Sequence, residues 1–287
     1  SLGLVGSEMC IRDRWNIGFR WIDRSAPTAF LSTEQVEQFD TEGYVVVPDL
    51  ISLAEVAEAR DEVDRFEAGT DQFLQSLDDE RMFIAESGAI TFTVHLVTRS
   101  PLLARLSQHP SIVSLCTDLI GPDVNLYWDQ AVYKKPEKPR RFPWHQDNSY
   151  AFVEPQQYLT VWLALTDATV DNGCPWVVPG LHRGGTLAHT YVEPLGLECL
   201  TEPAGAVAAP VSAGGAVVFS SLTPHLTGPN TTDAARKAYI LQYAPVGAEV
   251  LHGDPFAGAP THRLPANDPT RQYPIARGGR PVSSVAG

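Results

Sequence analysis

The segment WHQDNSY, residues 144–150, places an imidazole and a carboxylate two positions apart, at His145 and Asp147. In an extended segment such side chains fall on the same face and can aim at one point. An HxD pair alone also arises by chance, so a third ligand is needed, and His225 follows the apolar run AVVFS. Two imidazoles and one carboxylate leave coordination positions open, which suits Fe(II) oxygen chemistry better than a closed structural zinc site.

Arg236 lies eleven residues after His225, at the start of the apolar run RKAYILQYAP. A guanidinium entering such a strand would bury its charge unless it met an anion. The far carboxylate of a dicarboxylate co-substrate would supply that anion and accept a bidentate grip. A strand-end cap, or a pair with Asp233, is the simpler explanation of Arg236 taken alone. The joint pattern of HxD, later His and then Arg favours the co-substrate.

The elements that must position these residues change in character along the chain. Helix signals dominate about residues 31–122, and short β-rich runs separated by turn clusters fill about 124–246. Short strands at this spacing indicate an antiparallel barrel or sandwich. About 247–287 is expected to be a loop-rich tail. The helix starts are marked by capping-box pairs, Ser32 with Gln35 and Ser52 with Glu55, the second helix running to about Gly69.

Length and composition set limits on the class of protein. The 287 residues suit a single domain, 44% of them are hydrophobic, and the formal net charge is −13. That charge argues against a nucleic-acid partner, and no apolar run is long enough to span a membrane. Four cysteines without CxxC spacing indicate reduced thiols in a cytoplasmic protein. We expect a monomer or homodimer acting on a small-molecule substrate.

Residues 1–14, SLGLVGSEMCIRDR, show neither a signal-peptide core nor any periodicity. Read back into codons, Leu4 to Arg14 match a common transposon-based sequencing adapter. We therefore interpret this segment as a disordered assembly artefact fused to an environmental gene, with a natural N-terminus as the alternative. The domain would then span residues 15–287, and Cys10 would not be native.

At this point the sequence resembles the phytanoyl-CoA dioxygenase family of Fe(II)- and 2-oxoglutarate-dependent oxygenases. The resemblance runs from about Leu31 to Pro245 and rests on an ordered set of segments. These are TEGYVVVPDLIS, WHQDNSY, LTVWLALTDAT and NGCPWVVPGLH, with His225 and then Arg236 after them. It implies a mainly β protein whose core is a double-stranded β-helix (a cupin-like jelly roll) with N-terminal helices.

The resemblance also implies roles for individual residues. His145, Asp147 and His225 would bind Fe(II) as the catalytic centre, and Arg236 would hold 2-oxoglutarate, helped by Thr227, Trp162 and, less securely, Gln130. The enzyme would use O2 to hydroxylate an unactivated C–H bond and release succinate and CO2. Related halogenases replace the metal carboxylate by a small residue, so Asp147 favours hydroxylation. Candidates for lining the substrate cavity are Tyr150, Phe152, Asn148 and Arg141.

Other readings stay open from the residues alone. A zinc-dependent hydrolase could use the same three ligands but gives Arg236 no role, and a non-catalytic binding domain could retain the fold. His95 and His182 are more simply structural than functional. A basic cluster could recognise an anionic substrate, although a solvated loop explains it as well; its members are Lys134, Lys135, Lys138, Arg140 and Arg141.

Overall fold

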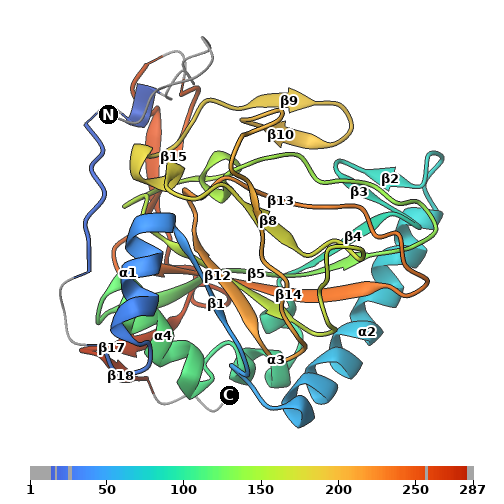
Figure 1. Ribbon diagram of the computed structural model, residues 1–287, viewed down its shortest axis with the longest axis horizontal. Coiled ribbons are helices and arrows are strands. Elements are labelled where there is room, and N and C mark those ends of the chain that lie inside the picture. The colour runs from blue at the N-terminus through green and yellow to red at the C-terminus, as the bar shows by residue number, and fades with distance from the viewer. Residues whose placement is uncertain (1–13, 17, 25–27, 256–257, 283–287) are drawn as a thin grey trace.

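The computed structural model describes residues 14–16, 18–24, 28–255 and 258–282 (Figure 1). The suspected adapter segment, residues 1–14, therefore lies outside the described residues except for the backbone of Arg14, and its origin stays a prediction. Directly after it, the short 3-10 helix η1 (Arg14–Asn16) carries the buried Asn16. The Asn16 amide donates to the backbone oxygens of Gly184 and Thr186, which ties this end of the chain to the domain.

The N-terminal helices begin where the capping boxes predict. Helix α1 (Thr33–Glu42) starts at Ser32 and ends at Gly43, whose φ of +85° is a left-handed conformation that glycine adopts without strain. Helix α2 (Leu53–Gln75) starts at Ser52 but runs past the predicted end near Gly69, because its last turn buries Leu74. The remaining helical segments are α3 (Pro101–Leu106), α4 (Pro110–Ile120), η2 (Leu96–Thr98), η3 (Asp147–Ser149) and η4 (Leu181–Gly184).

One large antiparallel sheet forms the centre of the molecule. Its strand order is β1 (Tyr44–Val47), β12 (Ala216–Ser220), β7 (Leu159–Ala164), β14 (Arg236–Pro245), β5 (Val124–Lys134), β4 (Ile90–Val94), β3 (Ala85–Glu86) and β2 (Arg81–Met82). A smaller sheet is ordered β11 (Val207–Ala208), β8 (Pro175–Val177) and β13 (His225–Thr227). In Figure 1 the helices α2, α3 and α4 lie below the large sheet, and β8 and β13 lie above it. This mainly antiparallel arrangement confirms the predicted fold class of a cupin-like β core with flanking helices.

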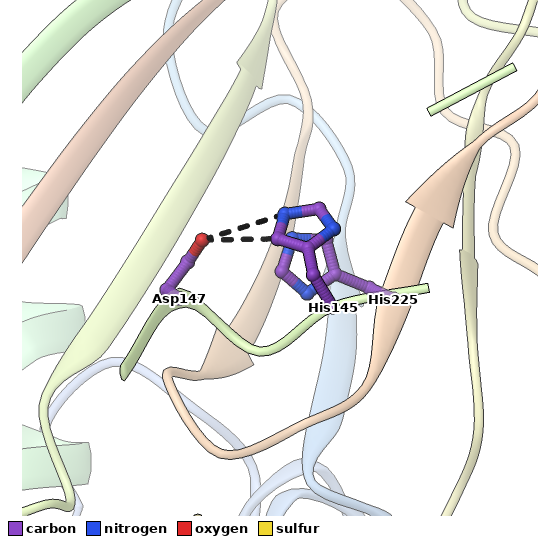
Figure 2. Close-up of side chains that lie close together, drawn as sticks. All are labelled: His145, Asp147 and His225. Carbon is purple, nitrogen blue, oxygen red and sulfur yellow. Dashed lines mark ion pairs between the residues drawn. The ribbon is translucent and has the colours of Figure 1, made fainter. Parts of the chain in front are cut away.

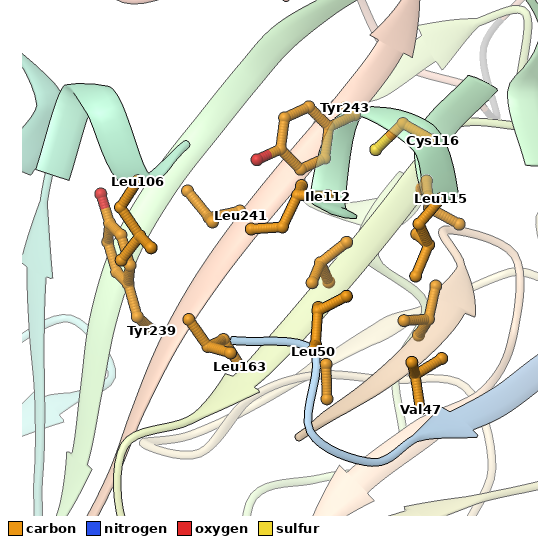
Figure 3. Packing of buried hydrophobic residues seen from close by; sticks show 14 of the residues in the cluster. Val47, Leu50, Leu106, Ile112, Leu115, Cys116, Leu163, Tyr239, Leu241 and Tyr243 are labelled. Carbon is orange, nitrogen blue, oxygen red and sulfur yellow. The ribbon is translucent and has the colours of Figure 1, made fainter. Parts of the chain in front are cut away.

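Alternation along β7 shows how the sheet separates two cores. Its odd-numbered residues join the apolar core between the sheet and the helices, whereas Trp162 and Ala164 join a second cluster between the two sheets. Figure 3 shows the first core, where Leu163 and Leu241 of the sheet pack with Ile112 and Leu115 of α4. The face of the sheet turned away from the helices is therefore the one that can carry a site.

The C-terminal part contains more regular structure than the sequence indicated. Strand β15 (Glu249–His252) pairs with β6 (Phe152–Glu154) and β16 (His262–Pro265), and β17 (Pro274–Arg277) pairs with both β5 and β18 (Arg280–Pro281). Short paired strands such as these leave no periodic signal in a Pro- and Gly-rich segment. A further hairpin joins β9 (Thr190–Val192) and β10 (Gly196–Glu198). Across the described ranges, no helix is long and apolar enough to cross a membrane.

Candidate metal and co-substrate site

The three predicted metal ligands meet at one point on the inner face of the sheets. His145 and His225 face each other across an isolated antiparallel bridge, each backbone N–H donating to the other's carbonyl at 3.0 and 2.9 Å. Their Nε2 atoms lie 3.9 and 3.7 Å from Oδ1 of Asp147. Figure 2 shows both rings turned toward that carboxylate. All three ligand atoms lie within 4.8 Å of one another, a spacing that one ion can bridge.

Each imidazole is held in the tautomer that metal binding requires. The Nδ1 of His145 lies 2.8 Å from the Pro143 carbonyl, and the Nδ1 of His225 lies 3.0 Å from the Thr223 carbonyl. A carbonyl only accepts, so both Nδ1 atoms carry the proton and both Nε2 lone pairs are free. Burial, reinforced by the neighbouring His225, lowers the pKa of His145 well below its usual value. His145 is therefore a neutral ligand at physiological pH, and the donor set fits Fe(II).

The second oxygen of Asp147 is fixed by a hydrogen-bonded chain. A carboxylate accepts only, so the hydroxyl of Thr160 donates to Oδ2 at 2.5 Å. The Nε2 of Gln242 in turn donates to the Thr160 hydroxyl at 3.3 Å, which leaves the Gln242 Oε1 as a spare acceptor. Partners of this kind orient a metal-binding carboxylate and tune its affinity.

Arg236 is a fully buried cation, with 1% of its surface exposed. Its guanidinium lies 4.8 Å from the centre of the Trp162 ring, and Nη1 makes one long bond to the Val132 carbonyl at 3.4 Å. The Nε and Nη2 atoms have no hydrogen-bond partner among the described residues. Burial lowers the pKa of Arg236 to about 9, so the group still carries its charge at neutral pH. A buried cation with unused donors is costly unless an anion binds beside it.

A cavity of about 470 Å³ opens above the candidate ligands. Its walls include Trp162, Thr227, Gln130 and Tyr150, so four of the predicted binding and lining residues lie together with the triad. Arg236 is not itself among the lining residues, but it belongs to the same face of β14 as Ile240 and Gln242, which are, and it lies against Trp162 of the cavity wall. This groups the proposed metal and co-substrate residues in one site.

Three predicted lining residues lie elsewhere. Asn148 and Phe152 line a separate hollow of about 310 Å³, and Asn148 is used internally, donating to Thr186 and accepting from the Val153 backbone. The physical reason is η3: the chain leaves the extended conformation at Asp147 and turns the next side chains away from the metal ligands. Arg141 pairs with Glu198 at 2.9 Å and is not among the residues that line the cavity.

His95 and His182, the two further histidines considered in the sequence analysis, have structural contacts, as expected. His182 is fully buried, with Nε2 3.1 Å from the Asp40 carbonyl and its ring edge-on to Trp21. His95 packs edge-on against Trp128 with a ring-centre distance of 4.3 Å and does not line the cavity. Neither ring contributes to the candidate site.

Three residues that line the cavity were not identified from the sequence: Thr160, Gln242 and Phe83. Thr160 lies two positions before Trp162 and Gln242 lies six after Arg236, so strand alternation alone could have placed both on the cavity face. Phe83 lies in a stretch without periodicity and gave no such signal.

The chain matches the family described as phytanoyl-CoA dioxygenase (PhyH) over residues 39–238. An ectoine dioxygenase of Nocardia farcinica is 30% identical over 268 residues, which cover 84% of this chain and 87% of that protein. A phytanoyl-CoA dioxygenase domain-containing protein 1 of Danio rerio is 27% identical over 261 residues, covering 73% and 88% respectively. The family match includes His145, Asp147, His225 and Arg236.

Solved structures give the same result. EctD from S. alaskensis, in complex with 2-oxoglutarate and 5-hydroxyectoine, superposes with a TM-score of 0.63 at 25% identity, covering 79% of this chain and 81% of that one. EvdO2 from Micromonospora carbonacea, complexed with 2-oxoglutarate, gives 0.60 at 27% identity, covering 76% and 93%. The chain belongs to the phytanoyl-CoA dioxygenase family and is an iron(II)- and 2-oxoglutarate-dependent dioxygenase.

Proposed function

We propose that this enzyme hydroxylates an unactivated C–H bond of a small molecule, with His145, Asp147 and His225 as the iron ligands and Arg236 as the anchor of 2-oxoglutarate. When bound, iron with 2-oxoglutarate supplies the oxidising chemistry: one atom of O2 enters succinate, the other enters the substrate, and CO2 is released. Three further points stay predictions from the sequence. They are the location in the cytoplasm, the monomeric or homodimeric state and the start of the domain at residue 15.

The protein's own contribution is geometry and exclusion of water. The bridge between His145 and His225 fixes the two imidazoles, and the Thr160 hydroxyl fixes the carboxylate of Asp147. Thr227 and Trp162 line the same cavity and can complete the co-substrate pocket around Arg236. Apolar walls keep the reaction away from bulk water, which protects a reactive oxidant from side reactions.

The observation that carries the proposal is the buried guanidinium of Arg236 with its unused Nε and Nη2 donors. A 2-oxoglutarate oxygenase needs a cation at this place to bind the carboxylate far from the metal, and a planar fork suits it. A zinc hydrolase would leave the same charge buried without a partner. This observation therefore gives no support to the alternatives of a zinc-dependent hydrolase or a non-catalytic binding domain.

The test is a titration of 2-oxoglutarate into the anaerobic Fe(II) protein, followed by the charge-transfer band of the bound co-substrate. Arg236→Gln removes one partner of a buried charge pair, which costs about 2–5 kcal/mol. Since about 1.4 kcal/mol is tenfold in affinity, we expect the apparent Kd to rise thirtyfold or more. Iron affinity should change little, because Arg236 is not a ligand.

Lys237→Gln is the matched control. Lys237 is the next residue of β14, points to the opposite face and pairs with Asp64 at 2.8 Å. Its loss should leave the titration unchanged. Equal 2-oxoglutarate affinity in Arg236→Gln and the parent would remove the basis for the co-substrate assignment.

A further inference from the structure

Large apolar side chains are exposed to solvent around the entrance of the cavity. Met82, Phe83, Val94 and Tyr150 all line it, and they are 45%, 81%, 38% and 44% exposed. Phe83 has the largest exposed fraction of any large apolar residue in the described part of the chain. Exposed apolar groups gathered at one opening indicate a surface that binds something apolar.

Phe83 also has an unfavourable backbone conformation. Met82 pairs with Ala85, so Phe83 and Ile84 form the tight turn of the β2–β3 hairpin, and the φ of Phe83 is +54°. Hairpin turns place glycine or asparagine at such positions, because the side chain of a bulky residue there crowds its own backbone. An exposed ring contributes little to folding, so neither burial nor backbone preference explains a phenylalanine here. A role in binding a ligand would explain why a phenylalanine occupies this position.

The hairpin is fixed by the basic cluster. Arg140 pairs with Glu86 at 2.8 Å and donates to the Ile84 carbonyl, Arg81 pairs with Glu86 at 3.0 Å, and Lys138 pairs with Glu80 at 3.1 Å. These contacts hold the turn over the cavity entrance. The Phe83 ring is thus presented at a defined place.

The remaining side chains of the cluster are also engaged by partners within the protein. Lys134 donates to the carbonyls of Arg140, Thr227 and Gly228, and Lys135 pairs with Glu67 at 2.8 Å. Apart from Asp147 and the two histidines of the triad, the described residues that line the cavity include no Lys, Arg, Asp, Glu or His. A substrate with a net charge would find no partner there.

The polar groups that do face the cavity are neutral. The indole N–H of Trp128 can only donate, and it lies 3.2 Å from Oε1 of Gln130. That contact leaves the Gln130 amide N–H groups as spare donors, while Gln242 offers its spare Oε1 as an acceptor. Such groups match hydroxyl or carbonyl oxygens on an otherwise apolar molecule.

We propose that the cavity takes an uncharged, flat, ring-containing substrate with hydroxyl or carbonyl oxygens, and that Phe83 stacks against its rings at the entrance. This inference rests on the proposed function. The cavity volume lies within the ~300–1,000 Å³ typical of sites for drug-sized ligands. Phe83 is then a specificity-determining residue rather than a catalytic one.

Binding can be measured by calorimetry on the anaerobic Fe(II) protein saturated with 2-oxoglutarate. The probes are flavone and estradiol as uncharged polycycles, with ectoine and hexadecanoyl-CoA as charged comparators. We expect the polycycles to bind more tightly than both charged probes. Phe83→Gly should weaken polycycle binding about two- to tenfold, because the substrate loses a stacked aromatic partner.

The glycine variant separates binding from folding. Glycine accepts the positive φ, so its melting temperature should not fall, and Phe30→Ala, an exposed ring that does not line the cavity, is the control. Tighter binding of ectoine or hexadecanoyl-CoA, or unchanged polycycle affinity in Phe83→Gly, would overturn the inference. The charge-transfer band in the same samples reports 2-oxoglutarate binding independently. A band without polycycle binding refutes the substrate class alone, whereas a missing band refutes the proposed function.

Discussion

The floor and the mouth of the cavity are built in different ways. The floor consists of His145, Asp147 and His225 with the side chains that hold them, and Arg236 lies buried against Trp162 of the same wall. Its supporting residues Thr160 and Gln242 belong to central strands of the large sheet and are almost fully buried. The mouth is formed by the exposed tip of the β2–β3 hairpin, at the edge of the same sheet, and is held by ion pairs.

Because of this difference, substitutions in the two regions should affect different properties of the enzyme. A change at the floor disturbs buried, mutually hydrogen-bonded groups and therefore the metal geometry. A change at the hairpin tip alters only the surface that an incoming molecule meets. We infer that chemistry is set by the central strands and selectivity by the edge, in line with the general independence of function from fold.

Asp147→Ala tests the floor with the largest expected effect. Removing the carboxylate takes away a proposed ligand, so iron binding and succinate formation should fall by more than the ~10–100-fold seen for loss of an outer partner. Circular dichroism should keep its β signature, because the two apolar cores do not depend on Asp147. Iron content and succinate release measure the effect, and Asp171→Ala, an exposed acid, is the control. Full iron occupancy with normal turnover would show that a different group is the third ligand.

Thr160→Val should have an intermediate effect, again on the floor. It removes the donor to Asp147 Oδ2 at nearly constant volume, so iron affinity should weaken ~10–100-fold. Thr91→Val is the matched control, since its buried hydroxyl also donates to a carboxylate, Glu67, at 2.8 Å but lies outside the cavity. Both variants should lose similar stability, about 1–3 kcal/mol. If both change iron affinity equally, the Thr160 bond has no special role in the site.

The same division describes what could be predicted from the sequence. The HxD spacing, the histidine after an apolar strand and Arg236 follow from local patterns and strand alternation. The structure brings His145, Asp147 and His225 together and places Arg236 against Trp162, whereas their roles stay predictions. The prediction failed for Asn148 and Phe152, because η3 interrupts the extended segment at Asp147. Helix α2 passed through Gly69 because tertiary burial of Leu74 outweighed a local propensity. Phe83 could not be predicted, since its turn uses a residue that turn preferences exclude.

Arg141→Gln has the smallest expected effect and tests whether a charged residue outside the cavity lining contributes to recognition. The sequence placed Arg141 in the substrate site, whereas the structure pairs it with Glu198 while 41% of its side chain stays exposed. Exposed pairs of this kind contribute about 0–1 kcal/mol, so the melting temperature should barely move. Affinities for 2-oxoglutarate and for flavone should be unchanged.

Glu198→Gln is the partner control, because it breaks the same ion pair from the other side. If the pair only joins the β9–β10 hairpin to the segment after β5, both variants should show the same small loss of stability and no change in ligand binding. If Arg141 instead binds the substrate, the two variants should differ. Glu198→Gln would then free the guanidinium and strengthen hexadecanoyl-CoA binding, while Arg141→Gln would abolish it. That outcome would show that a charged group recognises the substrate, and the proposed uncharged substrate would be wrong.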